Sequence, residues 1–157
     1  MERLGQYHRM ATVIGYGMIG ALLVFAAVVE TLKASNYEAG GLLPASTLEV
    51  IRYVFLGVAF VEFFVIRMIG RMILSGGGRV SGISNQGDLL LLKVRKLFIS
   101  AIVSLAFCES VWIYGLMLFL IGGSSFDFYL FIALALAFFA FYFPRYPKWE
   151  AWINAGG

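Results

Sequence analysis

The sequence predicts an all-α integral membrane protein, a bundle of four antiparallel transmembrane helices in a single domain over residues 1–157. Apolar residues make up 61% of the chain and charged residues only 13%, whereas soluble domains carry about 25% charged residues. The apolar residues gather in four long stretches, and short segments rich in turn formers separate them. A chain of this kind has too little polar surface to cover a water-facing globule.

A helix needs about 20 mostly apolar residues to cross the hydrocarbon, because each residue rises about 1.5 Å. Four stretches meet this condition, and the expected spans are residues 10–32, 50–69, 97–121 and 126–143. Pro144 and Pro147 discourage helix continuation, so the last span should end at Phe143. We therefore expect four helices of membrane-crossing length.

The connections predict how these helices are joined. The first connection contains Gly40, Gly41 and Pro44, which are turn formers. The last one, 122–125, is Gly-Gly-Ser-Ser and is so short that the third and fourth spans must form an antiparallel hairpin. Two successive hairpins are one arrangement that fits this pattern. The second connection, 75–94, is glycine-rich, and Asp88 is placed to cap a helical extension that begins at Leu89.

Basic residues near the span ends predict the orientation, because Lys and Arg concentrate on the cytoplasmic side. The span ends on one side of the membrane carry ten basic residues, and those on the other side carry two. We therefore expect both termini and the loop 75–94 in the cytoplasm, in a multi-pass protein of a bacterial inner membrane. The ten are Arg3, Arg9, Arg67, Arg71, Arg79, Lys93, Arg95, Lys96, Arg145 and Lys148, and the two are Lys33 and Arg52.

Several classes of function are disfavoured by what the chain contains. Cys108 is the single cysteine and His8 the single histidine, which excludes an internal disulfide, a CxxC motif and ligation of haem by two histidines of one chain. No Ser-His or Cys-His pairing and no phosphate-binding glycine motif occurs. We expect no enzyme, no cofactor and no metal site. The net charge of +3 comes from helix ends, so no nucleic-acid partner is expected.

Two acidic residues within the spans carry the functional information, since a charge at the bilayer centre costs at least about 2.5 kcal/mol. Glu109 lies near the centre of the third span. Its carboxyl should be protonated, bound to an ion or turned toward a protein partner. A proton or sodium carrier alternates between such states. The alternative is a structural carboxyl that hydrogen-bonds neighbouring helices.

Glu62 lies in the second span, at nearly the same depth as Glu109 if the two spans are antiparallel. Two carboxyls that face each other at one level would titrate as a coupled pair. We expect Glu62 and Glu109 to form one site with help from Ser110 and Tyr114. The alternative for Glu62 is a structural carboxyl or an intermolecular contact. Glu30 should instead be a solvated end charge that pairs with Lys33, three residues away.

The run 106–116, AFCESVWIYGL, resembles the ion-carrying helix of the rotary ATP synthase c subunit and related V-type proteolipids. In that family a mid-membrane carboxylate precedes an Ile-Tyr-Gly-Leu-like run, and the helix follows a basic cytoplasmic loop. The resemblance implies that Glu109 carries the ion and that Ser110 and Tyr114 complete the site. It further implies that Glu62 on the preceding helix contributes. The second span is bulky, however, and lacks the alternate-glycine pattern with which the family packs into a ring.

The sequence as a whole favours a protein that binds or translocates a small cation, a proton in preference to sodium. The carrier group would be a mid-membrane carboxylate, and ion-binding residues would be Glu109, Glu62, Ser110 and Tyr114. Its partners would be the lipid bilayer and either further copies of itself in a homo-oligomer or other membrane subunits. The alternative is a non-transporting structural or accessory membrane subunit whose buried carboxyls serve helix packing.

Overall fold

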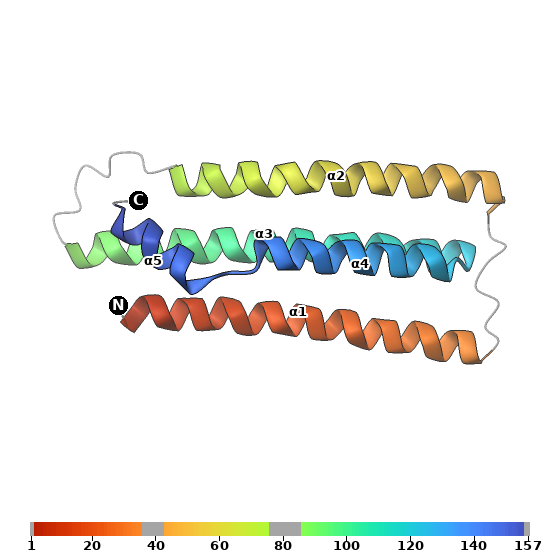
Figure 1. Cartoon of the computed structure of the whole chain (residues 1–157), viewed down its shortest axis with the longest axis horizontal. Coiled ribbons are helices and arrows are strands. Elements are labelled where there is room, and N and C mark those ends of the chain that lie inside the picture. The colour runs from red at the N-terminus through yellow and green to blue at the C-terminus, as the bar shows by residue number, and fades with distance from the viewer. Residues whose placement is uncertain (1, 36–42, 76–85, 156–157) are drawn as a thin grey trace.

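The computed structural model describes residues 2–35, 43–75 and 86–155. Within these ranges the chain is helical and contains no strand. The elements are α1 (Glu2–Ala34), α2 (Ala45–Ser75), α3 (Gln86–Gly122), α4 (Ser125–Tyr142) and α5 (Tyr146–Asn154). The first four form an antiparallel bundle, and α1 begins at the same end of the molecule where α5 finishes (Figure 1). The predicted all-α, four-helix antiparallel bundle is confirmed.

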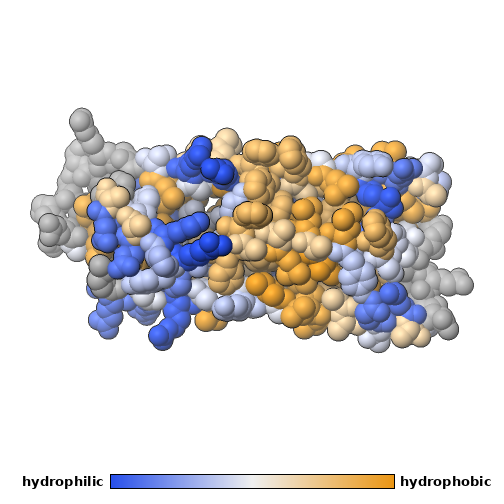
Figure 2. Space-filling model, in the orientation of Figure 1, coloured by the Kyte–Doolittle hydropathy of each residue, from blue (hydrophilic) through white to orange (hydrophobic). Residues whose placement is uncertain are grey.

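Four segments of the described chain are long and apolar enough to cross a membrane: 2–34, 45–75, 87–122 and 125–154. The last segment contains both α4 and α5. On the face that Figure 2 shows, apolar residues form a broad band across the middle of the bundle, with hydrophilic residues gathered toward both ends. This distribution indicates a multi-pass membrane protein, because the band matches a hydrocarbon layer and the ends match the headgroup regions.

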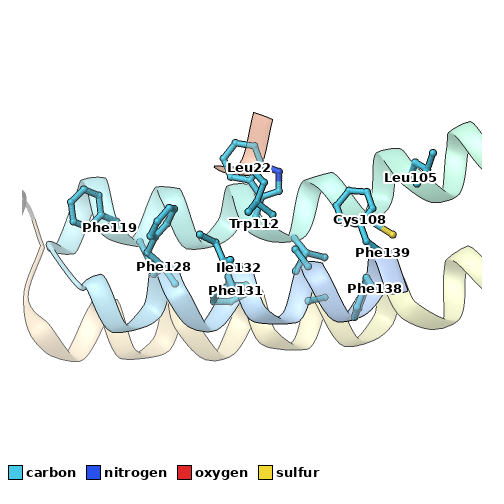
Figure 3. Packing of buried hydrophobic residues seen from close by; sticks show 14 of the residues in the cluster. Leu22, Leu105, Cys108, Trp112, Phe119, Phe128, Phe131, Ile132, Phe138 and Phe139 are labelled. Atoms are coloured by element: carbon cyan, nitrogen blue, oxygen red, sulfur yellow. The ribbon is translucent and has the colours of Figure 1, made fainter. Parts of the chain in front are cut away.

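Helix α3 is the centre of the bundle and packs against α1, α2 and α4. Helices α1 and α2 lie to either side of the α3–α4 pair (Figure 1). Close approach of α3 and α4 depends on Gly115, where an added Cβ would lie 2.6 Å from Phe131 Cβ and 3.1 Å from the Phe128 carbonyl oxygen. The core of the bundle is rich in aromatic residues (Figure 3), and its larger members include Trp112, Phe119, Phe128, Phe131, Phe138 and Phe139.

The turn between α3 and α4 has the tight geometry that the sequence predicts. Gly123 has φ 70°, a left-handed conformation that glycine adopts without steric cost. The Gly123 N–H donates to the Phe119 carbonyl at 2.8 Å and closes α3. Ser124 then caps α4, since its Oγ accepts the Asp127 N–H at 3.3 Å. These bonds account for the hairpin between the two helices.

At the end of the bundle that carries the N-terminus, the helical extension expected from Leu89 is present and begins three residues earlier, at Gln86. The glycines 76–78 and Arg79 of the predicted loop lie outside the described residues. After Pro144 the chain forms a further helix, α5, which has Pro147 in its first turn, where a missing N–H costs no hydrogen bond. The nitrogen His8 Nε2 lies 3.2 Å from the Pro144 carbonyl oxygen and ties α1 to this connection.

Helix α5 also packs its own side chains onto the bundle. Trp149 is buried against α1 and α3, in a cluster with Leu4, Ala11, Val94 and Leu97. Helices α1 and α3 extend beyond the level at which α4 ends, and α5 covers this extension. The apolar core therefore continues beyond α4.

Candidate functional site

Glu62 is buried on the one face of α2 that meets the bundle. The buried residues of α2 are Ala59, Glu62 and Ile66, and their spacing of three and four residues defines a single helical stripe. Only 9% of Glu62 is exposed. Since α2 packs mainly on α3, this stripe carries the carboxyl into the α2–α3 interface.

Two hydroxyl groups of α3 meet the Glu62 carboxyl there. The Tyr114 hydroxyl donates to Glu62 Oε1 at 2.6 Å, and Ser110 Oγ lies 3.1 Å from the same oxygen. Ser110 and Tyr114 are four residues apart and therefore share one face of α3. The other carboxyl oxygen, Glu62 Oε2, is buried and has no hydrogen-bond partner in the described part of the chain. We call Glu62, Ser110 and Tyr114 the carboxyl–hydroxyl cluster.

Ser110 has a second acceptor within reach. Its Oγ lies 2.7 Å from the Phe107 carbonyl oxygen, one helical turn earlier. A serine hydroxyl carries one proton and can also accept one. It can donate to an ionised Glu62, or it can donate to Phe107 and accept the proton of a neutral Glu62. Oε1 can thus keep hydrogen bonds in both protonation states without movement of a helix, whereas Oε2 has no partner among the described residues in either state.

Aromatic side chains surround the cluster. Phe55 stacks on the Tyr114 ring with centroids 4.9 Å apart and an interplanar angle of 26°. Phe131 meets the same ring edge-on at 6.3 Å. These contacts fix the tyrosine ring, so its hydroxyl stays directed at Glu62. Because the surroundings are apolar, hydrogen bonds within the cluster are stronger than they would be in water.

Glu109 does not belong to this cluster. It is half-buried, and no hydrogen bond or ion pair joins its carboxyl to any described residue. Successive helical residues are rotated by about 100°, so the face that presents Ser110 to Glu62 turns Glu109 away. The hydrogen bonds of Ser110 and Tyr114 therefore go to Glu62, and the joint site of Glu62 and Glu109 stays a prediction. Three of the four predicted residues come together.

The structure also pairs two residues that the sequence did not single out together. Arg52 on α2 holds Asp127 on α4, with Nε–Oδ1 at 2.6 Å and Nη2–Oδ2 at 2.9 Å. The Asp127 side chain is only 3% exposed and that of Arg52 is 31% exposed. Both residues stand at the start of spans that enter from the same side, and this was the available signal. At the same end, Lys33 Nζ donates to Glu30 Oε1 at 2.9 Å, as predicted.

All the polar groups of the carboxyl–hydroxyl cluster are oxygen donors or acceptors. Such groups suit a proton or a hard cation rather than a soft metal. Residues 2–35, 43–75 and 86–155 contain no group of three or more His, Cys, Asp or Glu side chains that could hold a metal ion. Small-cation chemistry at this site would therefore depend on one carboxyl, two hydroxyls and the Phe107 carbonyl.

The fold and this site together define a multi-pass helical membrane protein with a buried carboxyl–hydroxyl cluster. Comparison of the chain with protein-family models, curated proteins and solved structures finds no match. The resemblance of residues 106–116 to the c-subunit helix stays a prediction.

Proposed function

We propose that this membrane protein binds and moves a proton, in preference to a sodium ion, through the buried carboxyl of Glu62. The observation that carries the proposal is the bonding of Glu62 within the apolar bundle. Its Oε1 is held by the Tyr114 hydroxyl and lies within reach of Ser110, while its Oε2 has no hydrogen-bond partner among the described residues. Intramembrane ionisable groups are costly and usually functional.

The cluster offers a means of exchanging a proton at low cost. When Glu62 is ionised, Tyr114 and Ser110 can both donate to Oε1. When it is neutral, Ser110 can turn its proton to the Phe107 carbonyl at 2.7 Å and accept from the carboxyl. Because Oε1 keeps its hydrogen-bond partners in each state, a change of protonation requires only that the Ser110 hydroxyl turns. The same oxygen atoms would contact a sodium ion.

The proposal assigns Glu109 a lesser role than the c-subunit resemblance implies. That resemblance makes Glu109 the carrier, with Ser110 and Tyr114 as its helpers. The hydrogen bonds of both helpers favour Glu62 instead. Glu109, half-buried on the same helix, would be a second carboxyl along the path or at a contact with another subunit.

Transport also requires access to the cluster from both sides of the membrane. The orientation that we propose, with both termini in the cytoplasm of a bacterial cell, follows the ten-to-two distribution of basic residues. A lone four-helix bundle offers Glu62 no sheltered route, so we further propose that the protein works as a homo-oligomer or with other membrane subunits. Many large apolar side chains of α1 and α2 are exposed and available to lipid or to such neighbours.

The test is proton flux into liposomes that contain the purified protein, driven by a potassium diffusion potential and followed with an internal pH dye. Wild-type protein should exceed empty liposomes, and Glu62→Gln should abolish the excess. Glu30→Gln is the matched control, because Glu30 is an exposed carboxylate at the end of α1. Persistence of the wild-type rate in Glu62→Gln, with loss in Glu109→Gln, would transfer the carrier role to Glu109.

A second function is favoured by the way α2 is attached. Its buried stripe holds only Ala59, Glu62 and Ile66, and its polar links to the bundle include the cluster and the bond from the Tyr142 hydroxyl to the Phe63 carbonyl at 2.7 Å. The cluster would then be structural, within an accessory membrane subunit. In that case wild-type liposomes would show no flux above empty ones, and Glu62→Gln would lower stability alone.

A further inference from the structure

A cavity of about 330 Å³ opens between α2, α3 and the α4–α5 connection. It lies at the end of the bundle that carries both termini, where hydrophilic residues adjoin the apolar band (Figure 2). Four of its lining residues are basic, namely Arg67, Arg71, Arg145 and Lys148, and none is acidic. We call this cavity the basic pocket.

The cations of the basic pocket have no acidic partner within the described chain. The salt bridges among the described residues are Glu30–Lys33 and Arg52–Asp127, and both lie at the end of the bundle opposite to the pocket. Arg67 and Arg71 stand four residues apart on one face of α2, so their charges repel. The Arg145 guanidinium donates a hydrogen bond from Nη2 to the Ala140 carbonyl at 3.1 Å. Four like charges around one cavity favour an anion.

Neutral polar groups complete the lining. Ser100 and Ser104 contribute hydroxyls from α3, and Trp149 and Trp152 contribute indole rings from α5. Tryptophan is enriched at the headgroup level of membranes because its ring is apolar and its N–H is polar. The Ser104 hydroxyl donates to the Ser100 carbonyl at 2.8 Å. The basic pocket thus combines cations, the Ser100 hydroxyl and interfacial aromatic rings at the depth of lipid headgroups.

A second, apolar cavity of about 400 Å³ lies beside the basic pocket, between α2 and α4. Its lining is wholly apolar and includes Leu56, Phe60, Leu134 and Ala137. Phe141 lines both cavities, so the two are neighbours along one side of the bundle. We call the second cavity the acyl groove.

We propose that the basic pocket and the acyl groove together bind one anionic phospholipid, with its phosphate among Arg67, Arg71 and Lys148 and one acyl chain in the groove. Basic pockets between transmembrane helices are suited to anionic headgroups. A free phosphate would use the basic pocket and leave the groove without a role, whereas a lipid uses both. The positive charge of the pocket also disfavours it as a route by which a cation reaches Glu62.

The test measures retention of phosphatidylglycerol and of phosphatidylcholine by the detergent-purified protein, with native mass spectrometry at equal lipid concentrations. Phosphatidylglycerol should be retained preferentially. Arg67→Gln/Arg71→Gln should weaken that binding by roughly tenfold to thirtyfold, as expected when two basic side chains that contact the headgroup are removed. Arg9→Gln/Arg95→Gln is the matched control. It removes the same charge from exposed residues at the same end of the bundle, outside the pocket, and should change binding by less than about twofold.

The groove is tested separately with Ala137→Trp, which places a bulky ring in the acyl groove from an exposed position on α4. Phosphatidylglycerol binding should fall, while helicity by circular dichroism and elution from gel filtration stay unchanged. Equal loss in the two double variants would show that general surface charge attracts the lipid and would overturn the proposal. So would equal retention of the two lipids, or binding of glycerol 3-phosphate alone with the affinity of the whole lipid.

Discussion

The Tyr114 hydroxyl and the Glu62 carboxyl, 52 residues apart in the chain, meet at 2.6 Å inside the bundle. This bond joins α2 to α3 at a place where α2 otherwise presents only apolar residues to its neighbour. Loss of this bond should lower the free energy of unfolding, because a buried carboxyl that loses its hydrogen-bond donor retains its desolvation cost.

Tyr114→Phe should therefore destabilise the protein by about 1–3 kcal/mol, measured by unfolding in mixed micelles of sodium dodecyl sulfate and mild detergent. The Glu62→Gln/Tyr114→Phe double variant should lose less than the sum of the single variants, with a coupling of about 0.5 kcal/mol or more. Tyr16→Phe is the control, since Tyr16 is 64% exposed, and should change stability by less than about 0.5 kcal/mol. Strict additivity would mean that the two side chains act independently.

The Arg52–Asp127 pair should respond asymmetrically to mutation. Arg52→Gln leaves a carboxylate that is 3% exposed without its cation, and we expect a loss of about 3 kcal/mol. Asp127→Asn leaves Arg52, which is 31% exposed and can turn to water, so the loss should be about 1–2 kcal/mol. Arg52→Gln/Asp127→Asn should be more stable than Arg52→Gln alone. The same unfolding assay checks this order, and a reversed order of the single variants would contradict it.

Gly115 is expected to be intolerant of even one added methyl group. Gly115→Ala would place Cβ 2.6 Å from Phe131 Cβ and should force α3 and α4 apart, at a cost of about 1–3 kcal/mol. Gly20→Ala is the matched control within a helix, because no atom lies within 4 Å of its added Cβ. It should be neutral or stabilising by up to about 1 kcal/mol. Thermal unfolding in detergent distinguishes the two, and equal midpoints would refute the close approach.

Dicyclohexylcarbodiimide, which modifies protonated carboxyls in apolar surroundings, should label Glu62 faster than Glu30. Glu62 is 9% exposed and lies among apolar side chains, whereas the Glu30 side chain is 53% exposed and paired with Lys33. Peptide mass spectrometry after short reaction times gives both rates, and that of Glu109, in one sample. Sodium should slow labelling of Glu62 if the cluster accepts that ion. Faster reaction at Glu30 would contradict this order and would argue against Glu62 as the carrier carboxyl.

The helices could be predicted from the sequence because bilayer thickness imposes a length and an apolar composition on each of them. The α3–α4 hairpin was also predictable, because a connection as short as Gly123 and Ser124 permits only a tight turn. The sequence does not predict helix α5, because Pro144 and Pro147 indicate only the end of the preceding helix. The second proline lies in the first turn of α5, where proline favours a helix start.

The depth of the candidate site in the membrane could be predicted from the sequence, but the direction of its side chains around the axis of α3 could not. Counting residues placed Glu62 level with the middle of α3, and the antiparallel order brought it near Ser110 and Tyr114. Depth alone could not decide between Glu109 and Ser110, which are adjacent in the chain but about 100° apart around the helix. The spacing of four between Ser110 and Tyr114 was the available signal, because it defines a face that excludes Glu109.

The central position of α3 bears on how the protein is made. Helices α1 and α2 leave the ribosome first, yet each finds its main partner in α3, which is synthesised later. Both can enter the bilayer before α3 is complete, because each is long and apolar enough to span it. Synthesis of α3 supplies the surface on which α1 and α2 dock, and α4 follows α3 directly after Gly123 and Ser124. The contacts that join α1 and α2 to α3 therefore require a segment that ends at Gly122 of the 157 residues.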